Sequence, residues 1–335
     1  MTTHADAIAT IVMYHVVRNA AGVPAALKGL DADAFRGQLA YIRAHYTPVG
    51  LFDLVAASTG SQPLPPRAIV LTFDDGYAGH HDIVLPLLAD AHVPAAFFPV
   101  ASASLDRAVL DINKVQFILA ASGDVGRLVE IVDATIERHR PRLPAPAEYR
   151  RKWWMPSRWD LPEVVYVKRL LQHALPEDVR RGLVDELFRT MVSADERGFA
   201  DELYMNRNQL VELHQAGMTI GIHGDRHLRL AVLPRDEQAV EIDGALRVLD
   251  AVGLPRQRFA YSYANGDHND DSIELLQARG CSIAVTTRPD LARVGRDRLL
   301  TLPRIDTNDL PVGADAEPNE WTRRAMTAGG ALQQR

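Results

Sequence analysis

The sequence predicts an α/β fold, in which parallel strands alternate with crossover helices, with a mostly helical insert in the middle of the chain. Three observations support this prediction. Apolar strand-like runs alternate with amphipathic helical segments on both sides of the insert, an order typical of parallel sheets. Residues 101–204 interrupt this alternation with helical patterns alone. The 335 residues, 47% of them hydrophobic, are enough for one large α/β barrel or two ordinary domains.

Before the insert, the chain is expected to form three strands and two helices. Phe35, Leu39 and Ile42 recur near helical spacing and indicate a helix at 31–46. The remaining elements of this half are strands at 11–16, 69–73 and 95–100 and a helix at 83–91.

After the insert, the alternation resumes with an amphipathic helix at 209–218. Gly217 is expected to end that helix, because glycine is favoured just past a helix C-terminus. A long helix at 235–252 is predicted from the apolar stripe of Val240, Leu246 and Leu249. The other elements of this half are strands at 218–222, 258–263 and 282–286 and a helix at 270–279.

Two adjacent carboxylates follow the strand at 69–73, in the motif Thr72-Phe73-Asp74-Asp75-Gly76-Tyr77. Neighbouring side chains on a strand normally point apart. Where the strand ends in a glycine turn, both can reach one site, so that one carboxylate can hold a metal and the other can act as a base. A solvated Asp-Asp-Gly turn explains the motif equally well when it is taken alone.

A pair of histidines follows the strand at 218–222, in the segment His223-Gly224-Asp225-Arg226-His227. Histidine is a common ligand for zinc and other first-row ions. Gly221 and Gly224 favour a loop for this segment over a helix. Since the sites of parallel barrels lie at the carboxyl ends of the strands, the carboxylates and histidines are expected at the same end of the fold. A surface loop that happens to hold two histidines becomes the weaker explanation.

Together these motifs resemble the polysaccharide deacetylase family, also called the NodB homology or carbohydrate esterase 4 family. Residues 72–77 match its first motif, and residues 223–227 match its second, H-[S/T]-x-x-H, with Gly224 at the Ser/Thr position. The resemblance covers residues 9–100 and 205–305. It implies a distorted (β/α)7-type, TIM-like barrel. It also implies that Asp75, His223 and His227 bind a divalent metal, most simply Zn²⁺, with Co²⁺ or Ni²⁺ as alternatives, and that Asp74 is the general base.

The third family motif, R-x-P-Y-G, is only partly present at residues 262–266, where Gly266 alone is kept. In the family, the backbone N–H at the Tyr position stabilises the oxyanion, and Asn265 can supply such a donor here. The family's arginine pairs with the base, and Ser262 stands in its place. Arg304, near a late strand end, is the expected replacement. The histidine of the family's L-x-H motif, a general acid, has no match, and His15 and His268 are the candidates for its role.

The function implied by this resemblance is metal-dependent hydrolysis of an N-acetyl group on an amino sugar of a glycan or glycan precursor, with Asp74 as general base and a metal-bound water as nucleophile. Two alternatives remain. One is hydrolysis of another bond, as in a deformylase, a cyclic imide hydrolase or an O-acetyl esterase. The other is a non-catalytic glycan-binding protein on the same scaffold, which the missing arginine and acid motifs favour and the complete Asp-Asp-His-His set disfavours.

A single domain is expected over residues 1–310, interrupted by the insert at about 101–204 and followed by a weakly ordered tail at 311–335. The insert has helical patterns around an aromatic centre, Trp153-Trp154-Met155-Pro156-Ser157-Arg158-Trp159. This centre is interpreted as a cap with sugar-stacking surface or a partner contact, or else as packing against the barrel. The helical patterns of the insert lie at 114–121, 125–138, 164–175 and 176–192.

The overall charge of −6, with dispersed Lys and Arg, excludes an electrostatic footprint for nucleic acid. The single cysteine, Cys281, excludes a disulfide framework and is expected in a buried strand. The N-terminus lacks the positive region of a signal peptide, and no run is long enough to span a bilayer. A cytoplasmic protein is therefore expected, acting on intracellular precursors such as sugar nucleotides or lipid-linked glycans, with peripheral membrane contact left open.

Overall fold

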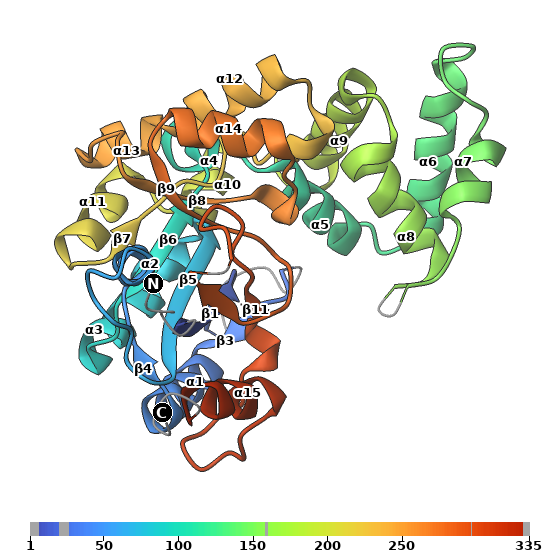
Figure 1. Cartoon of the computed structure of the whole chain (residues 1–335). Helices are drawn as coiled ribbons and strands as arrows, with labels where there is room; N and C mark the ends of the chain where they lie inside the picture. Colours follow the sequence, from blue (N-terminus) through green and yellow to red (C-terminus); the bar gives the residue numbers. More distant parts are fainter. Residues whose placement is uncertain (1–6, 20–26, 158–159, 296, 331–335) are drawn as a thin grey trace. The chain divides into compact units, whose positions relative to one another are not determined.

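The computed structural model describes residues 7–19, 27–157, 160–295 and 297–330 (Figure 1). These residues form two compact units. The first comprises the described residues before residue 23, residues 29–107 and residues 201–330. The second comprises residues 27–28 and 108–200. The helical insert expected at about 101–204 falls on nearly the same residues as the second unit.

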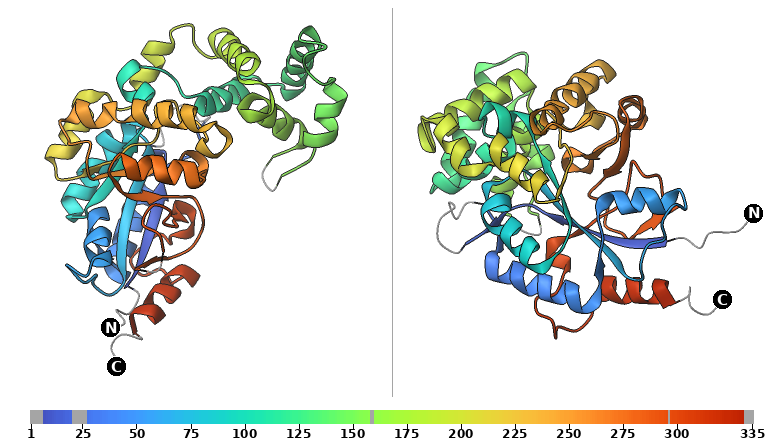
Figure 2. Two further views of the ribbon diagram at one scale, coloured as in Figure 1. Left: turned by 45° about the horizontal axis from the view of Figure 1, so that its top comes forward. Right: turned by 90° about the vertical axis from the view of Figure 1, so that its left-hand side faces the viewer.

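A ring of parallel strands forms the centre of the first unit, with helices outside it (Figures 1 and 2). Strands β1, β5, β6 and β7 are paired in parallel in that order. The ring continues through a bridge between Ile222 and Tyr261 to β8, which pairs with β9. A bridge between Val285 and Leu302 and the pairing of β11 with β1 close it. The ring strands are β1 Ala7–Tyr14, β5 Ala68–Asp75, β6 Ala95–Pro99, β7 Thr219–Ile220, β8 Phe259–Ser262, β9 Cys281–Val285 and β11 Ile305–Asp306.

The other elements of the first unit lie around this ring. Four short strands are β2 Val17–Arg18, β3 Leu30–Asp31, β4 Thr47–Pro48 and β10 Ala292–Val294, the last antiparallel to β1. The α-helices are α1 Ala32–His45, α2 Leu51–Ser58, α3 Leu85–Ala91, α4 Ala101–Asp106, α11 Arg207–Gln215, α12 Arg235–Ala245, α13 Arg247–Val252, α14 Asp270–Ala278 and α15 Glu320–Gly330. Shorter helical turns are η1 His80–Val84, η3 Leu230–Val232, η4 Ala264–Gly266 and η5 Thr307–Asp309.

The second unit is helical, as its sequence patterns predict. Its elements are α5 Asp111–Ala121, α6 Val125–Arg138, α7 Pro146–Trp153, α8 Pro162–Arg169, η2 Leu170–Ala174, α9 Glu177–Met191 and the start of α10 Glu196–Leu203. Phe199 packs edge-on against Phe117 and Phe188, at centroid distances of 4.8 and 5.3 Å, which joins α5, α9 and α10. Of the aromatic centre, Trp154 is 36% exposed and Met155 is 50% exposed, and residues 158–159 lie outside the described residues.

Aromatic side chains on three neighbouring strands stack at the same height in the barrel, just before the carboxyl ends of the strands. Phe73 stacks on Tyr14 at 4.9 Å on one neighbouring strand and on Phe97 at 4.8 Å on the other. These residues are direct register partners in the sheet. The whole of β5 is buried, because parallel strands inside a barrel are covered on both faces. The residues that follow Phe73 therefore emerge together at the carboxyl end of the ring.

The helix expected at 235–252 is interrupted at Leu246, so that α12 and α13 are separate. The predicted stripe is wrong at Val240, which is 68% exposed. Gln238 and Glu241 face inwards in its place, because each finds backbone partners there. A polar side chain is buried readily when it is hydrogen-bonded.

The tail after residue 310 differs from the weakly ordered segment that was expected. Residues 320–330 form α15, and Thr322 is fully buried against the barrel. Its hydroxyl lies 2.8 Å from the Tyr41 hydroxyl and accepts a hydrogen bond from the Tyr46 hydroxyl at 2.9 Å. These bonds tie the helix to α1, a long-range contact that the Gly- and Ala-rich composition of the tail does not indicate. Residues 331–335 lie outside the described residues.

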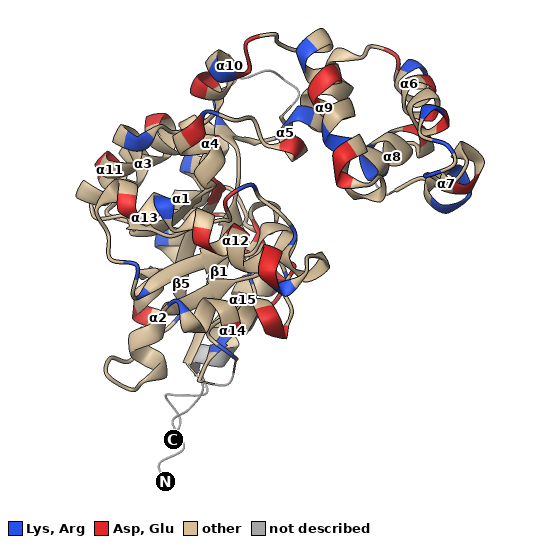
Figure 3. Cartoon of the chain, turned by 90° about the horizontal axis from the view of Figure 1, so that it is seen from above, with Lys and Arg blue, Asp and Glu red and all other residues tan. Residues whose placement is uncertain are grey.

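The single cysteine and the dispersed charges lie as the sequence predicts. Cys281 is buried in β9, and burial raises the pKa of its thiol to about 12. Acidic and basic side chains are interspersed along the helices of both units (Figure 3). Within the described residues, every helix is too short or too polar to cross a membrane.

Candidate active site at the carboxyl ends of the strands

The two carboxylates at the end of β5 are separated by a change in backbone direction. Asp75 and Gly76 both have left-handed backbone angles, with φ of 72° and 77°. A Cβ at position 76 would lie 2.9 Å from the Cβ of Pro99, so the close approach of β6 requires glycine. Both carboxylates are buried, at 1% exposure for Asp74 and 4% for Asp75. The Asp-Asp-Gly turn is therefore an internal feature of the barrel.

The histidine segment leaves β7 beside β6 and β8. A Cβ at position 221 would lie 2.5 Å from the Phe98 ring, so only glycine fits at this position without a clash. The His223 N–H donates to the Pro99 carbonyl oxygen at 3.2 Å, which places His223 next to the end of β5. His227 lies in a loop, with a left-handed φ of 61°.

Asp75, His223 and His227 come together as a group that could hold a metal ion. Asp75 Oδ1 lies 3.4 Å from His223 Nε2 and 3.5 Å from His227 Nε2, and the ligand atoms all lie within 4.8 Å of one another. That oxygen is buried and accepts no hydrogen bond within the part of the chain that the structure describes. A buried, unpaired carboxylate oxygen that faces two imidazole nitrogens fits a divalent cation.

The hydrogen bonds and charges of the histidines suit this role. His223 Nδ1 lies 2.7 Å from the Ser262 carbonyl oxygen. Because a carbonyl only accepts, Nδ1 carries the proton, and the lone pair of Nε2 faces Asp75, as metal-ligating histidines require. Burial lowers the pKa of His223, but the nearby Asp74 and Asp75 outweigh it and raise that pKa. Burial lowers the pKa of His227 to about 4, so that His227 is neutral at pH 7.

Asp74 faces a different set of partners, led by Arg304. Nη2 of Arg304 donates to Oδ2 at 2.6 Å and Nη1 donates to Oδ1 at 3.0 Å, a two-point pairing. The Ser262 hydroxyl also donates to Oδ2, at 3.1 Å. The structure thus brings Arg304 to the position that the sequence predicts for it. Ser262, which stands at the arginine position of the third family motif, contacts the same carboxylate through this hydroxyl.

These partners determine the protonation state of the two carboxylates. Burial raises the pKa of Asp74, but the Arg304 guanidinium and His223 outweigh burial and bring it down to about 2. For Asp75, burial again raises the pKa, but the neighbouring His223 and His227 outweigh burial and lower it well below the usual range. Both groups are therefore carboxylates at neutral pH.

His15 follows β1 and lies close enough to Asp74 and Asp75 to contribute to lowering the pKa of both carboxyl groups. Its carbonyl oxygen accepts a hydrogen bond from His80 Nε2 at 2.6 Å. His80 is fully buried, and burial lowers its pKa to about 4. The neutral His80 ring thus holds the chain at His15.

Asn265 and His268 are less closely connected to the carboxylates. Asn265 is exposed, with a left-handed φ of 56°, and its carbonyl oxygen accepts a hydrogen bond from the Thr287 hydroxyl at 3.2 Å. The described residues include no hydrogen bond from Asn265 to Asp74 or Asp75. The His268 ring packs at a tilt against Tyr263, at a centroid distance of 4.9 Å, and its Nδ1 lies 3.0 Å from the Gly266 carbonyl oxygen.

Three residues of this site were not predicted. Ser262 stands at the arginine position of the third family motif, which gives no reason to expect it as a partner of the base. His80 lies just after the first motif, outside any motif that would mark it. Thr72 accepts a hydrogen bond from Arg304 Nη1 at 3.0 Å. Thr72 lies two residues before Asp74, so the alternation of a strand places the two side chains on one face, a signal that was available in the sequence.

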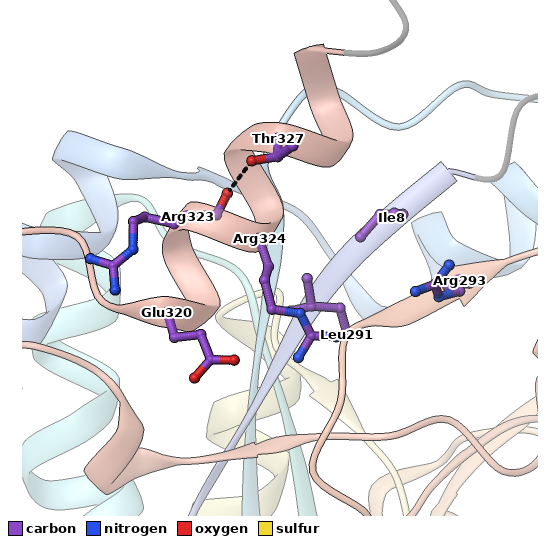
Figure 4. Close-up of a pocket in the computed structure, with 7 residues that line it drawn as sticks. All are labelled: Ile8, Leu291, Arg293, Glu320, Arg323, Arg324 and Thr327. Atoms are coloured by element: carbon purple, nitrogen blue, oxygen red, sulfur yellow. Dashed lines mark hydrogen bonds between the residues drawn. The ribbon is translucent and has the colours of Figure 1, made fainter.

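A shallow cavity of about 490 Å³ lies at the other end of the ring, between α15 and β10 (Figure 4). Ile8, near the start of β1, forms part of its wall, and Arg293 and Arg324 lie at its edge. Because β1 and β5 run in parallel, this cavity is at the amino ends of the strands and is separate from the carboxylates.

Comparison with known proteins points to the same family as the sequence motifs. A family model described as polysaccharide deacetylase matches residues 61–126 and 191–284, a range that includes both carboxylates and both histidines. Over these two segments the chain is similar to the polysaccharide deacetylase family. The residues between the matched segments are mostly those of the second unit, and Arg304 lies beyond the second segment.

Solved deacetylase structures have the same fold over nearly the whole chain. The Streptococcus pyogenes deacetylase PplD in complex with acetate aligns with a TM-score of 0.56 and 16% identity, over 96% of this chain and 99% of that one. IcaB from Ammonifex degensii aligns with a TM-score of 0.55 and 16% identity, over 97% of each chain. The (β/α)-barrel fold of the NodB kind, predicted from the sequence, is confirmed.

A curated deacetylase shares sequence with one part of this chain. Over 70 residues the chain is 43% identical to poly-beta-1,6-N-acetyl-D-glucosamine N-deacetylase of Escherichia coli (strain K12). This match covers 21% of the chain and 10% of the relative. The same match is found with the corresponding protein of Escherichia coli O157:H7.

Proposed function

We propose that this protein is a metal-dependent carbohydrate N-deacetylase of the polysaccharide deacetylase family, a hydrolase that removes an N-acetyl group from an amino sugar. The observation that carries the proposal is the division between two neighbouring carboxylates. Asp75 faces His223 and His227 with an unpaired oxygen, and Asp74 faces Arg304 and the Ser262 hydroxyl. One carboxylate is thus arranged as a ligand, and the other as a proton acceptor held in a fixed orientation.

A divalent ion, Zn²⁺ most simply, would be held by Asp75, His223 and His227. When bound, such an ion polarises an acyl carbonyl and acidifies a water molecule. Asp74 would take the proton of that water. With a pKa of about 2, Asp74 is a weak base, so an acidified proton donor is needed for transfer to it. The low pKa of Asp74 is thus in keeping with a metal site next to it.

Arg304 and Ser262 would keep Asp74 ionised and aimed at the substrate. Because Arg304 pairs with Asp74 through two hydrogen bonds, the base does not lack the arginine that its family motif would supply. This pairing supports catalysis over a purely glycan-binding role. The backbone N–H of Asn265 is proposed as an oxyanion donor and His15 as the acid that protonates the leaving amine.

The substrate proposed is a glycan or glycan precursor with N-acetylated amino sugars. The sequence match to a poly-beta-1,6-N-acetyl-D-glucosamine N-deacetylase and the shared fold with solved deacetylases support this class. An N-acetylglucosamine oligomer is therefore the first substrate to test.

The deciding experiment compares the unchanged chain with Asp74→Asn. With zinc supplied, the unchanged chain should release acetate from an N-acetylglucosamine oligomer, whereas release of formate from an N-formyl analogue without any release of acetate would favour the deformylase alternative. Asp74→Asn should lose turnover by at least about a hundredfold, since general base catalysis contributes roughly 10²–10⁴-fold, while the zinc content is unchanged. Retained turnover in that variant would remove Asp74 from the mechanism, and a chain that binds no zinc would contradict the metal site.

A further inference from the structure

Glu241, on α12, is a buried carboxylate close to the histidine segment. Its side chain is only 2% exposed. Oε1 accepts hydrogen bonds from the backbone N–H groups of Arg226 at 2.9 Å and of Leu228 at 3.1 Å. These are the residues immediately before and after His227. One carboxylate oxygen thus holds the backbone on both sides of a proposed metal ligand.

The backbone of His227 needs such support. Its φ of 61° lies in the left-handed region, which is unfavourable for a residue with a Cβ. A residue keeps this conformation only where its surroundings fix it. The hydrogen bonds to Glu241 fix the peptide groups on either side, and thereby the direction in which the imidazole leaves the chain.

The first part of the histidine segment is held by other groups. The Ala101 and Ser102 N–H groups donate to the carbonyl oxygens of Gly224 and Asp225 at 3.2 and 2.8 Å. The Asp225 side chain pairs with Arg247 at 2.5 Å. His223 is held separately, through the Ser262 carbonyl oxygen. A change at Glu241 therefore acts first on His227.

Glu241 also accounts for a departure from the family motif. Gly224 stands where the second motif has Ser or Thr, and its φ is 86°. A Cβ at Gly224 would lie 2.7 Å from Oε1 of Glu241. The glycine therefore leaves room for the carboxylate, so that Gly224 and Glu241 form a matched pair.

We propose that Glu241 is a positioning residue for the metal ligand His227, acting through the N–H groups of Arg226 and Leu228. This inference rests on the metal site of the proposed function. A group that orients a ligand without touching the metal typically contributes 10–100-fold to metal affinity. Loss of Glu241 is expected to weaken binding to that extent by loosening His227.

The experiment measures zinc and cobalt affinity of the full chain by competition with a chromophoric chelator. Glu241→Ala should weaken binding roughly 10–100-fold. Glu241→Asp, whose shorter side chain cannot reach both N–H groups, should also weaken it. Glu241→Gln keeps an acceptor oxygen at the same reach and should bind nearly as tightly as the unchanged chain. Glu237→Ala is the matched control, because Glu237 is an exposed glutamate one turn earlier on α12.

Two further readouts separate positioning from general stability. The visible spectrum of bound cobalt should change in Glu241→Asp and stay unchanged in Glu241→Gln. Thermal unfolding without metal reports any loss of fold. A Glu241→Asp variant that unfolds earlier yet binds cobalt with unchanged affinity and spectrum would overturn the proposal. If the unchanged chain binds neither metal, the proposed metal site fails, and the role of Glu241 fails with it.

Discussion

Replacing Arg304 by Met tests the ion pair on which the state of Asp74 depends. Arg304 is fully buried and donates to Asp74 twice, to Thr72, to Ser262 and to the Thr286 carbonyl oxygen. Met fills a similar volume without a charge, so Asp74 is left as a buried carboxylate with the Ser262 hydroxyl alone. Breaking a buried pair in this way costs about 3–5 kcal/mol.

The loss of stability in Arg304→Met should depend on pH. Without Arg304, burial raises the pKa of Asp74 above its unfolded value, so the penalty is largest at high pH and is relieved as Asp74 takes up a proton on acidification. Denaturant unfolding at pH 5 and pH 8 measures this difference, with up to about 1.4 kcal/mol per pH unit expected. Adding Asp74→Asn should restore part of the stability.

The control for this prediction is Arg256→Met. Arg256 pairs with Asp250 at the surface, with both side chains about half exposed, so little change is expected. If Arg304→Met lowered the free energy of unfolding by less than about 1 kcal/mol at every pH, the reasoning would be refuted, because an unpaired buried charge should destabilise the fold by more than that.

Two other changes test the backbone turn and the buried histidine. Gly76→Ala should lower the free energy of unfolding by about 1–3 kcal/mol through left-handed strain, and a clash with Pro99 should add to this loss. It should also reduce zinc affinity by moving Asp75. Gly123→Ala is the control, because Gly123 is left-handed but lies in open space, and equal losses of stability in both variants would contradict the role of Pro99. His80 has a pKa lowered by burial, so its neutral form stabilises the fold above pH 6.5, and that stability is lost as pH falls towards about 4. The loss is up to about 3 kcal/mol, and His80→Phe should remove that part of the pH dependence in urea unfolding; an unchanged profile would show that other groups cause it.

Most of the barrel was predictable because its longer strands are largely buried apolar runs. The end of β5 was predictable only together with the histidine segment, because the Asp-Asp-Gly motif taken alone fits a solvated turn equally well. Arg304 was predictable through the family resemblance, which implies an arginine partner for the base, because Ser262 stands at the motif position and Arg304 lies near a late strand end. The structure brings Asp75, His223 and His227 together, as the sequence predicts. The chemical roles of these residues stay predictions.

Other features depend on contacts that one segment of sequence does not contain. Periodicity predicts Val240 in the core, but Gln238 and Glu241 are buried instead, because Gln238 donates to the Leu233 carbonyl oxygen and Glu241 accepts from the Arg226 and Leu228 N–H groups of the preceding loop. Helix α15 is tied down by Tyr41 and Tyr46, which lie 281 and 276 residues before Thr322 in the chain. Local propensity describes a segment by itself, whereas the partners that decide such cases come from elsewhere in the fold.

The pairing of Asp74 with Arg304 spans 230 positions of sequence. During synthesis, at roughly 5–20 residues per second, the base leaves the ribosome on the order of tens of seconds before its partner exists. Strands β7, β8 and β9 are made in that same interval, and β11 follows Arg304. Until Arg304 is made, Asp74 lacks the cation that holds its pKa low, so burying Asp74 earlier would leave an unpaired buried charge.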